Sequence, residues 1–394
     1  MPACSSSFIA ARRGQPGAGD GDGLLELWHV CSVLPDPRKP QGIRHSVATV
    51  VALAVAAVAA GARSLSGIGA WAGDLPGPVR ARFGVGRAVP STATFARVLA
   101  GVDTDVLDGV LCAWTAVRAG PGLSSAPIAV DGKTARGARR ADGSRVHLFA
   151  ALTHDGTPLG QVVAPTKGFE IAVFRTLLDR VDLRGRVVTA DALHTQVAHA
   201  HYLHAHGAHY AFTVKANQPR LRARLAALPW DQVPVGDVQV QAGHGRRERR
   251  AVQLIGKVRP AIGFPHARLV ARITRTRAGH EGNDPTHEAV YVISNLPEDT
   301  TAGQIAALVR GHWAIENRLH WVRDVTFDED RSTVRTGALP AAMATLRNTA
   351  IGLLRATGVT NIAATTAAMN RRVTRVLALL EPPSTVLTSQ HGRL

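Results

Sequence analysis

The sequence has few cysteines, few lysines and no long hydrophobic run. The small number of cysteines and the lack of a long hydrophobic run each exclude a class of protein. The three cysteines, Cys4, Cys31 and Cys112, are widely separated and form no CxxC pair, so they predict neither a disulfide framework nor a cysteine zinc site. The longest apolar stretch, residues 47–61, is shorter than the roughly 20 residues of a membrane span and predicts a buried helix. Residues 1–23 lack the apolar region of a signal peptide. We therefore expect a disordered tail at 1–23, a cytoplasmic protein and no membrane partner.

Acidic residues are also fewer than basic residues. Lys and Arg total 46 against 29 Asp and Glu, which gives a formal net charge of +17. On a globular chain such a surplus indicates a polyanionic partner, usually nucleic acid. The 394 residues are 45% hydrophobic, which is enough to bury one or more cores and excludes wholesale disorder or a single small binding module. Part of the arginine excess accompanies abundant Ala and Gly and is typical of a high-GC genome.

The chain divides by periodicity into helical and strand-rich regions. Residues 24–120 predict a compact helical N-terminal domain, with Ser91 and Asp103 as caps of helices at 92–99 and 104–117. Basic residues at 38–45 precede its longest helix, and contact with phosphate or plain solvation explains them equally well.

A change to short β-like runs begins near residue 126. Strand, strand, strand, helix, strand, helix, strand is the predicted order, which indicates an α/β sheet with an antiparallel edge and a parallel interior. The predicted segments of this region are 128–130, 147–152, 159–164, 170–183, 186–189, 195–206 and 210–214. Residues 219–299 then predict a β-rich insertion, with strands at 237–241, 250–257, 269–273 and 289–293 and a basic run of Arg246, Arg247, Arg249 and Arg250. Helical patterns return at 302–322, 340–357 and 361–380.

Three acids stand where a metal site is expected. Asp131 and Asp191 each follow closely on a predicted buried strand, where a carboxylate is costly unless it is paired or bound to a metal. Glu316 lies on the predicted helix 302–322, and helical spacing places it on one face with His312, Leu319, His320 and Arg323. A lone Asp-Gly is more often a surface turn, but the combination favours a site. Three carboxylates suit Mg²⁺ or Mn²⁺, and two such ions about 3.5 to 4 Å apart clamp an in-line phosphoryl displacement.

A resemblance to a known family follows from the motifs around these acids. They are AVDGKTARG, HLFAA, LGQ, VTADALHTQ, YAFTVKANQP and HWAIENRLHWVRDVTFDED. Together and in this order they resemble bacterial insertion-sequence transposases of the ISAs type, which include the H-repeat-associated proteins, from about residue 36 to about residue 380. The resemblance implies a ribonuclease H-like catalytic fold whose DDE triad is Asp131, Asp191 and Glu316.

Two stretches depart from related DDE transposases. Those proteins carry a tyrosine-arginine-glutamate-lysine signature around the third acid. Glu316 matches its glutamate and Arg323 takes the lysine position, whereas His312 and Val309 replace the arginine and the tyrosine. Residues 167–171 lack the small polar residue and asparagine that usually precede the Glu-Ile pair. This departure affects a local substrate or packing contact and does not affect the triad.

Other polar clusters have competing explanations. Six histidines between 194 and 209 crowd one helix and its exit, but without HExxH, a nearby cysteine or an acid at ligand spacing they favour a solvated helix over zinc. The acids at 324–330 are better explained as exposed, or as partners of Arg323 and Arg331, than as metal ligands. Glu170 either approaches the metal or sits favourably at a helix N-terminus. Lys133 and Lys215 each follow a predicted strand beside the site and are expected to contact DNA phosphates.

These features predict a DDE transposase that cleaves and transfers an insertion sequence. Its partners are double-stranded DNA, both element ends and target, and further copies of itself assembled on DNA. The phosphate-contacting residues are Lys133, Lys215, Arg246, Arg247, Arg249, Arg250, His312 and Arg323. The helical domain at 24–120 binds the element ends, residues 126–218 and 300–345 form the catalytic core, and 346–394 form C-terminal helices. A domesticated DNA-binding derivative and a plain metal-dependent nuclease are the alternatives; the intact triad disfavours the first, and the helical domain and basic insertion disfavour the second.

Overall fold

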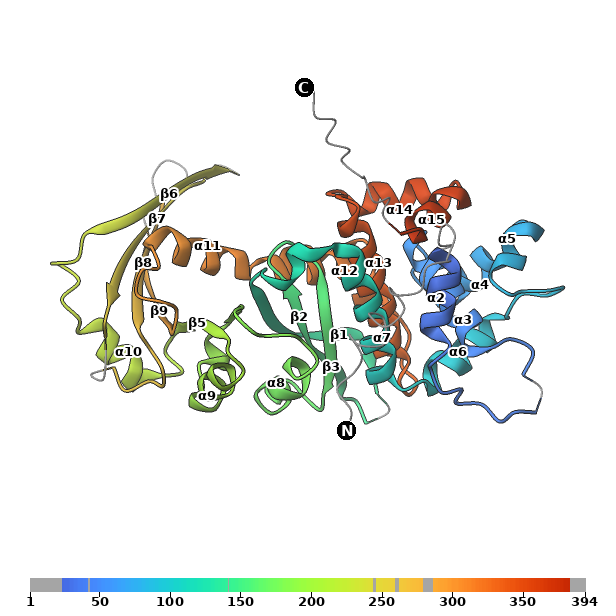
Figure 1. Ribbon diagram of the computed structural model, residues 1–394, viewed down its shortest axis with the longest axis horizontal. Helices are drawn as coiled ribbons and strands as arrows, with labels where there is room; N and C mark the ends of the chain where they lie inside the picture. Colours follow the sequence, from blue (N-terminus) through green and yellow to red (C-terminus); the bar gives the residue numbers. More distant parts are fainter. Residues whose placement is uncertain are drawn as a thin grey trace, which may run out of the picture. The chain divides into compact units, whose positions relative to one another are not determined.

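The computed structural model describes residues 23–41, 43–140, 142–243, 246–258, 262–278 and 286–382 (Figure 1). These residues form two compact units. The helical unit comprises the chain up to residue 121 together with 135–146 and the chain from residue 322. The sheet unit comprises 122–134 and 147–321.

The helical unit is built from short, well-capped helices. Side-chain oxygens of Ser46, Ser64, Ser91 and Asp103 accept hydrogen bonds from backbone N–H groups in the first turns of four of them, which satisfies donors that the helices leave open. The caps predicted at Ser91 and Asp103 are thus confirmed. The helices are α2 (Gly23–Cys31), α3 (Val47–Ala59), α4 (Leu65–Gly73), α5 (Gly77–Arg82), α6 (Thr92–Gly101), α7 (Thr104–Ala119), α12 (Trp321–Val325), α13 (Leu339–Ala356), α14 (Ile362–Asn370) and α15 (Val373–Leu380).

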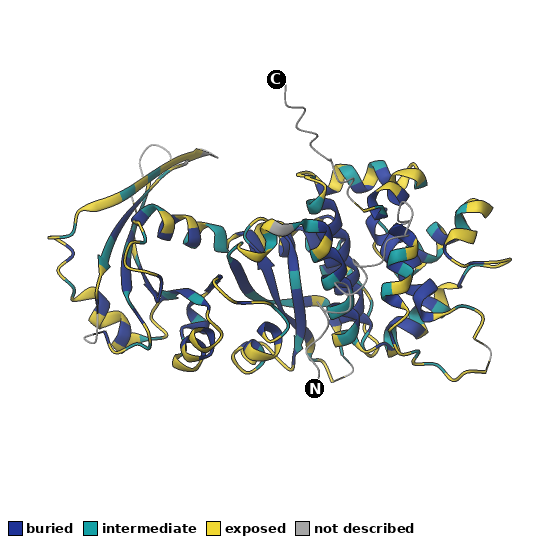
Figure 2. Cartoon of the chain, viewed as in Figure 1, coloured by how far each residue is buried: buried dark blue, intermediate teal, exposed yellow. Residues whose placement is uncertain are grey.

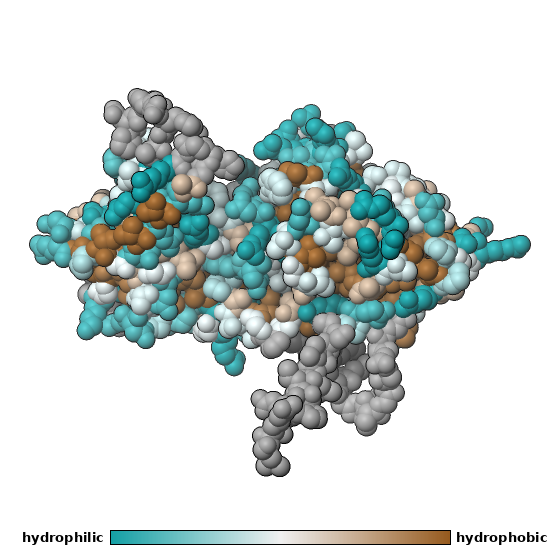
Figure 3. Space-filling view, turned by 90° about the horizontal axis from the view of Figure 1, so that it is seen from above, coloured by the Kyte–Doolittle hydropathy of each residue, from teal (hydrophilic) through white to brown (hydrophobic). Residues whose placement is uncertain are grey.

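Helices α3 and α13 form the centre of this unit. Every residue of α3 is buried, as its run of Ala and Val predicts, and α13 packs against α7, α3 and α6 (Figure 2). The described part of the chain has no helix long and apolar enough to cross a bilayer. Hydrophobic side chains that do reach the surface form patches among hydrophilic ones on the face seen in Figure 3.

The described residues of the sheet unit form one sheet of nine strands, in the order β3-β2-β1-β4-β5-β9-β8-β7-β6. Strands β1, β4 and β5 run parallel to one another, whereas β2 with β3 and the series β5-β9-β8-β7-β6 pair antiparallel. The predicted antiparallel edge and parallel interior are therefore present. The strands are β1 (Ile128–Arg139), β2 (Arg145–Thr153), β3 (Pro158–Ala164), β4 (Val187–Ala190), β5 (His209–Val214), β6 (Val235–Gly243), β7 (Arg246–Gly256), β8 (Leu269–Ala278) and β9 (Thr286–Ser294).

Helices cover both faces of this sheet. On one face a core joins the sheet to α8 (Glu170–Leu178), α9 (Val197–Ala205) and α10 (Pro219–Ala226). On the other face α11 (Ala302–His312) packs on β4, β5, β6, β7 and β8 through Ile305, Ala306 and Leu308 (Figure 1). Side chains alternate between the two faces, so that Phe212 enters the first core and Ala211 the second.

Three elements differ from the sequence-based prediction. Strand β1 continues to Arg139, so Asp131 and Gly132 lie inside a strand and not at its end. The helix predicted at 302–322 is interrupted: α11 ends at His312 and a π-helical segment spans Ile315–His320, in which the Trp321 N–H donates to the Glu316 carbonyl five residues earlier. The helix predicted at 361–380 is two helices, α14 and α15, which break at residues 371–372.

Candidate active site

Asp131 and Asp191 lie at matching positions of two neighbouring parallel strands, Asp131 within β1 and Asp191 directly after the end of β4. Val130 of β1 is opposite Ala190 of β4, so the residue that follows each of them is one of the two aspartates. One Asp191 carboxylate oxygen accepts the Leu193 N–H at 2.9 Å and caps the short 3-10 turn after β4. Both aspartates line a pocket of about 430 Å³ that Glu316 also lines. The sheet register thus brings together two acids that are distant in the sequence.

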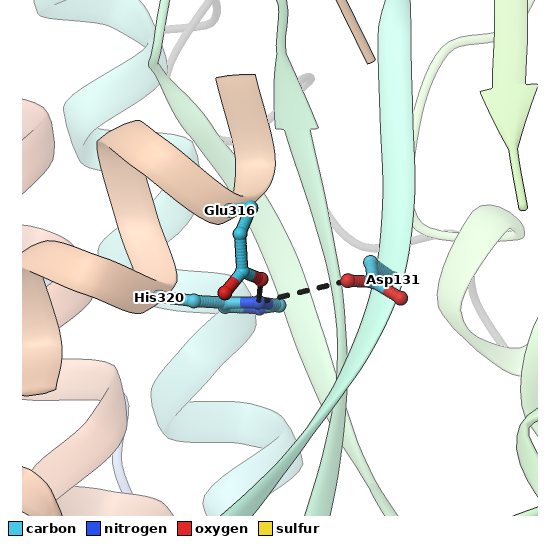
Figure 4. Close-up of side chains that lie close together, drawn as sticks. All are labelled: Asp131, Glu316 and His320. Atoms are coloured by element: carbon cyan, nitrogen blue, oxygen red, sulfur yellow. Dashed lines mark hydrogen bonds and ion pairs between the residues drawn. The ribbon is translucent and has the colours of Figure 1, made fainter. Parts of the chain in front are cut away.

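Glu316 and His320 extend from the π-helical segment toward Asp131 (Figure 4). The His320 Nδ1 atom is 3.0 Å from Glu316 Oε2 and 3.7 Å from Asp131 Oδ2. One nitrogen or oxygen from each of these three residues lies within 4.8 Å of the others, and in the described part of the chain no other group of His, Cys, Asp or Glu meets that criterion. The sequence had placed His320 on the same helix face as Glu316 but had assigned it no role.

Burial and the neighbouring acids disfavour the charged form of Asp131. Burial, with smaller contributions from the nearby carboxylates of Asp191, Glu170 and Glu316, raises the pKa of Asp131 to about 7 against a hydrogen bond from the Gly132 N–H. The pKa of Glu316 is lowered, first by its hydrogen bond with His320 and also by the charge of Lys133. A divalent cation would offset this crowding, and carboxylate oxygens are the donors that Mg²⁺ and Mn²⁺ prefer. The residues present therefore fit the metal that the sequence predicted.

Three polar side chains predicted to contact DNA surround the pocket. Lys133 is on β1 two residues after Asp131, and Lys215 is exposed directly after β5 at the pocket wall. His312 also lines the pocket, with its Nδ1 3.3 Å from Thr189 Oγ1. Burial lowers the pKa of His312 to about 4, so its imidazole is neutral near pH 7 and offers a hydrogen bond to phosphate but no positive charge.

Glu170 lies behind this pocket rather than in it. Its carboxylate is buried between His147 Nε2, at 2.5 Å, and His194 Nε2, at 3.4 Å. Burial alone would raise its pKa, but the hydrogen bonds with these two histidines outweigh burial and lower the pKa to about 2. A Cβ atom at Gly132 would come within 2.1 Å of Glu170 Oε1, so a glycine next to Asp131 is needed for this close contact. Neither contact was foreseen from the sequence.

The structure corrects the prediction for Arg323. Its side chain is fully buried in the helical unit, with NH2 2.7 Å from Glu329 Oε1. Glu329 also pairs with the buried Arg347 at 2.8 Å, so the predicted partnership of the 324–330 acids with Arg323 is confirmed for Glu329. The π-helical turn changes the 3.6-residue spacing on which the single-face prediction rested, so Glu316 is 53% exposed whereas Leu319 and Arg323 are buried. Arg323 is therefore a structural residue here and is not available to phosphate.

The basic run 246–250 is divided between the two faces of β7, because neighbouring residues of a strand point in opposite directions. Arg250 lines the active-site pocket, on the same face as Val252 of the α11 core. Arg247 and Arg249 point to the opposite face and are exposed, and the side chain of Arg246 lies outside the described residues. The run is therefore divided between two surfaces, and its contact with DNA phosphates stays a prediction.

Arginines from β8 and α11 join Arg250 on the pocket face. Glu248 pairs with Arg250 at 2.6 Å, with Arg275 at 2.5 Å and with Arg277 at 3.1 Å. Arg310 of α11 donates to side-chain oxygens of Gln239 and Gln241 on β6. The sequence contained a signal for this cluster, because Arg275 and Arg277 alternate with threonines directly after the predicted strand 269–273, but the prediction considered only the basic run at 246–250.

Histidines in and around the histidine-rich helix contact aromatic rings and one another. His194 and His199 are buried and stack with Phe174 and with each other. His201 Nδ1 is 3.0 Å from Nε2 of His266, whose ring stacks on His204. The sequence analysis assigned no zinc to this helix, and these contacts do not test that prediction.

Comparison with known proteins adds to this geometry. The family model described as "Transposase DDE domain" matches residues 123–353, and the one described as "DDE_Tnp_1-associated" matches residues 28–115. The chain is 28% identical over 350 residues to "Putative transposase YncI" of Escherichia coli O157:H7, covering 84% of this chain and 88% of the relative. It is 28% identical over 348 residues to "H repeat-associated putative transposase YhhI" of Escherichia coli strain K12, covering 84% and 90%. A cryo-EM structure of the piggyBac transposase synaptic complex with hairpin DNA aligns with a TM-score of 0.43 and 11% identity, covering 93% of this chain and 83% of that one.

Proposed function

Because the chain belongs to the transposase DDE domain family and is a DNA transposase of the H-repeat-associated kind, we propose that Asp131, Asp191 and Glu316 are its catalytic triad. The observation that carries this proposal is the register of β1 and β4, which places the two aspartates side by side in a pocket that Glu316 completes. The family implies a divalent metal, and we assign its binding to these three carboxylates, with Mg²⁺ or Mn²⁺ as the ion.

The reaction follows from the chemistry of phosphoryl transfer. When bound, divalent ions held by Asp131, Asp191 and Glu316 would supply activation of the attacking oxygen and stabilisation of the leaving oxygen in an in-line displacement. Water is the first nucleophile at the element end, and the 3′-hydroxyl that it exposes is the second, attacking target DNA. The carboxylates of Asp131, Asp191 and Glu316 would hold and orient these ions, and we assign contact with DNA phosphates to Lys215, which lines the pocket, and to Lys133, which follows Asp131 on β1.

We propose a ribonuclease H-like fold for the catalytic part. The strand order β3-β2-β1-β4-β5, with a parallel β1-β4-β5 interior, supports it, as does the position of the two aspartates on the central pair. Strands β6 to β9 continue this sheet from β5, and we assign residues 219–299 to an insertion that carries DNA-binding residues.

We assign the phosphate contacts outside the triad to the pocket face of the insertion. Arg250, Arg275 and Arg277 gather there around Glu248, and Arg310 adds a fourth arginine from α11. Because phosphate contacts carry no sequence information, recognition of the element ends needs a different part of the chain. We assign it to the helical region 24–120, and we expect the protein to act as a homo-oligomer assembled on DNA.

Cleavage and strand-transfer assays test the triad. Asp131→Ala, Asp191→Ala and Glu316→Ala are each expected to abolish nicking of element-end DNA in Mg²⁺ while DNA binding persists, because binding and chemistry use different groups. Glu288→Ala is the matched control, since it removes a carboxylate of the same pocket that lies outside the proposed triad, and it should leave nicking unchanged. If all three alanine variants still nick, the triad assignment is wrong. Nicking without strand transfer by the unmodified protein would instead indicate a plain nuclease.

A further inference from the structure

His320 is the most buried side chain of the group that faces the proposed metal. Its side chain is 3% exposed, whereas those of Asp131 and Glu316 are 29% and 53% exposed. Its Nδ1 atom faces both carboxylates at once, as Figure 4 shows. We propose that His320 is a ligand of the divalent metal held by Asp131 and Glu316, so that one ion has a nitrogen donor besides its carboxylates. This inference rests on the proposed function.

The distances suit a shared ion. For metal–ligand bonds of about 2.1 Å, neighbouring ligand atoms of a tetrahedral or octahedral ion lie about 3 to 3.5 Å apart and opposite ones about 4.2 Å apart. The His320 Nδ1 atom is 3.0 Å from a Glu316 oxygen and 3.7 Å from an Asp131 oxygen, and the three ligand atoms all lie within 4.8 Å of one another. Small side-chain shifts are therefore enough to bring all three atoms onto one ion.

The local fold explains why the histidine is presented in this way. Glu316 and His320 are four residues apart in a π-helical segment, so both side chains leave the same face toward Asp131 of β1. A buried imidazole has few orientations open to it, and this one directs its ring nitrogen at two carboxylates rather than at solvent. The competing role is that of a positioning residue, which would only hold Glu316 by a hydrogen bond. The two roles differ at one atom, because a ligand offers the Nδ1 lone pair to the metal and a positioning residue donates a proton from Nδ1.

A nitrogen donor has consequences for the choice of metal. Imidazole binds Mn²⁺ and later transition ions more readily than it binds Mg²⁺ or Ca²⁺, which prefer an all-oxygen shell. We therefore expect Mn²⁺ to bind more tightly than Mg²⁺ in direct competition. Loss of even an outer partner of a metal ligand costs about 10- to 100-fold in affinity, so His320→Gln should raise the Mn²⁺ dissociation constant by at least about tenfold.

The test uses the full-length protein and Mn²⁺ alone, without DNA. Mn²⁺ binding is followed by electron paramagnetic resonance at about pH 8, where histidine is neutral, and electron spin-echo modulation then reports any nitrogen bonded to the ion. We expect a histidine nitrogen coupling in the unmodified protein and its loss in His320→Gln. In His320→Asp an oxygen replaces the nitrogen, so Mn²⁺ should still bind while the coupling disappears. His312→Gln is the matched control, because it removes another histidine of the same pocket and should leave the coupling in place.

The outcomes separate this inference from the proposed function. In one outcome, the unmodified protein binds Mn²⁺ without a nitrogen coupling and Asp131→Asn abolishes that binding. His320 is then not a ligand, but the carboxylate site stands. The same conclusion follows if the coupling survives in His320→Gln or vanishes in His312→Gln. If the unmodified protein binds no Mn²⁺ at all, both the ligand assignment and the proposed metal site are wrong. If His320→Gln does not fold, His320→Asp and the His312→Gln control still show whether His320 supplies the nitrogen.

Discussion

The two faces of strand β7 allow a test of where DNA lies. Arg250 and its cross-strand neighbour Arg275 are on the active-site face, whereas Arg247 and Arg249 are exposed on the opposite face of the same strand. The double variants Arg250→Gln/Arg275→Gln and Arg247→Gln/Arg249→Gln therefore remove the same charge from the same sheet. We expect only the first pair to weaken DNA binding strongly.

The magnitude follows from counterion release. Each phosphate contact contributes about 0.9 to the slope of log affinity against log salt concentration on duplex DNA, so two lost contacts should flatten the slope by about 1.8. Long-range charge alone is screened beyond about 10 Å at 0.1 M salt, so the opposite-face pair should change the slope by much less than one. Glu248 pairs with both Arg250 and Arg275 and keeps their guanidinium groups together. Because Glu248 already neutralises part of their charge, the value of about 1.8 is an upper limit for the flattening of the slope.

Fluorescence anisotropy with a labelled element-end duplex at several salt concentrations gives the slope for each protein. Thermal unfolding of both double variants serves as the control for folding. Equal flattening by the two pairs would mean that net charge rather than this face governs binding. Greater flattening by the opposite-face pair would place the DNA on the other side of the sheet and refute the proposed track.

Two further predictions concern stability. Glu329→Gln leaves two buried arginines without their carboxylate and should lower the free energy of unfolding by about 3 to 5 kcal/mol; urea denaturation measures this, and Asp328→Asn, at a half-exposed neighbouring acid, should change it little. Burial lowers the pKa of His154, His199 and His312 from 6.5 to about 4, so the unfolded chain binds more protons than the folded one between these values. Stability should therefore fall as the pH falls through this window, and a melting temperature that stays constant from pH 6.5 to 4 would contradict the neutral state of these histidines.

The sequence by itself predicted most strands and helices and singled out the three acids that line one pocket in the structure. Alternating and 3.6-residue patterns are local, so the strand before Asp191 was predicted within one residue of its observed bounds, whereas β1 continues past Asp131 to Arg139. The same holds for the capped helices after Ser91 and Asp103. A carboxylate after a buried strand is a local signal too, because its desolvation cost is high wherever the strand packs.

Only the tertiary structure decided which side chains meet. The burial of Arg323 depends on Glu329 and on Arg347, which joins them from another helix. The division of the basic run depends on which face of β7 packs on α11, and no residue of the run encodes that face. His320 reaches Asp131 because a π-helical turn replaces the regular helix and β1 lies opposite that turn. Such contacts join residues far apart along the chain, and local periodicity carries no information about them.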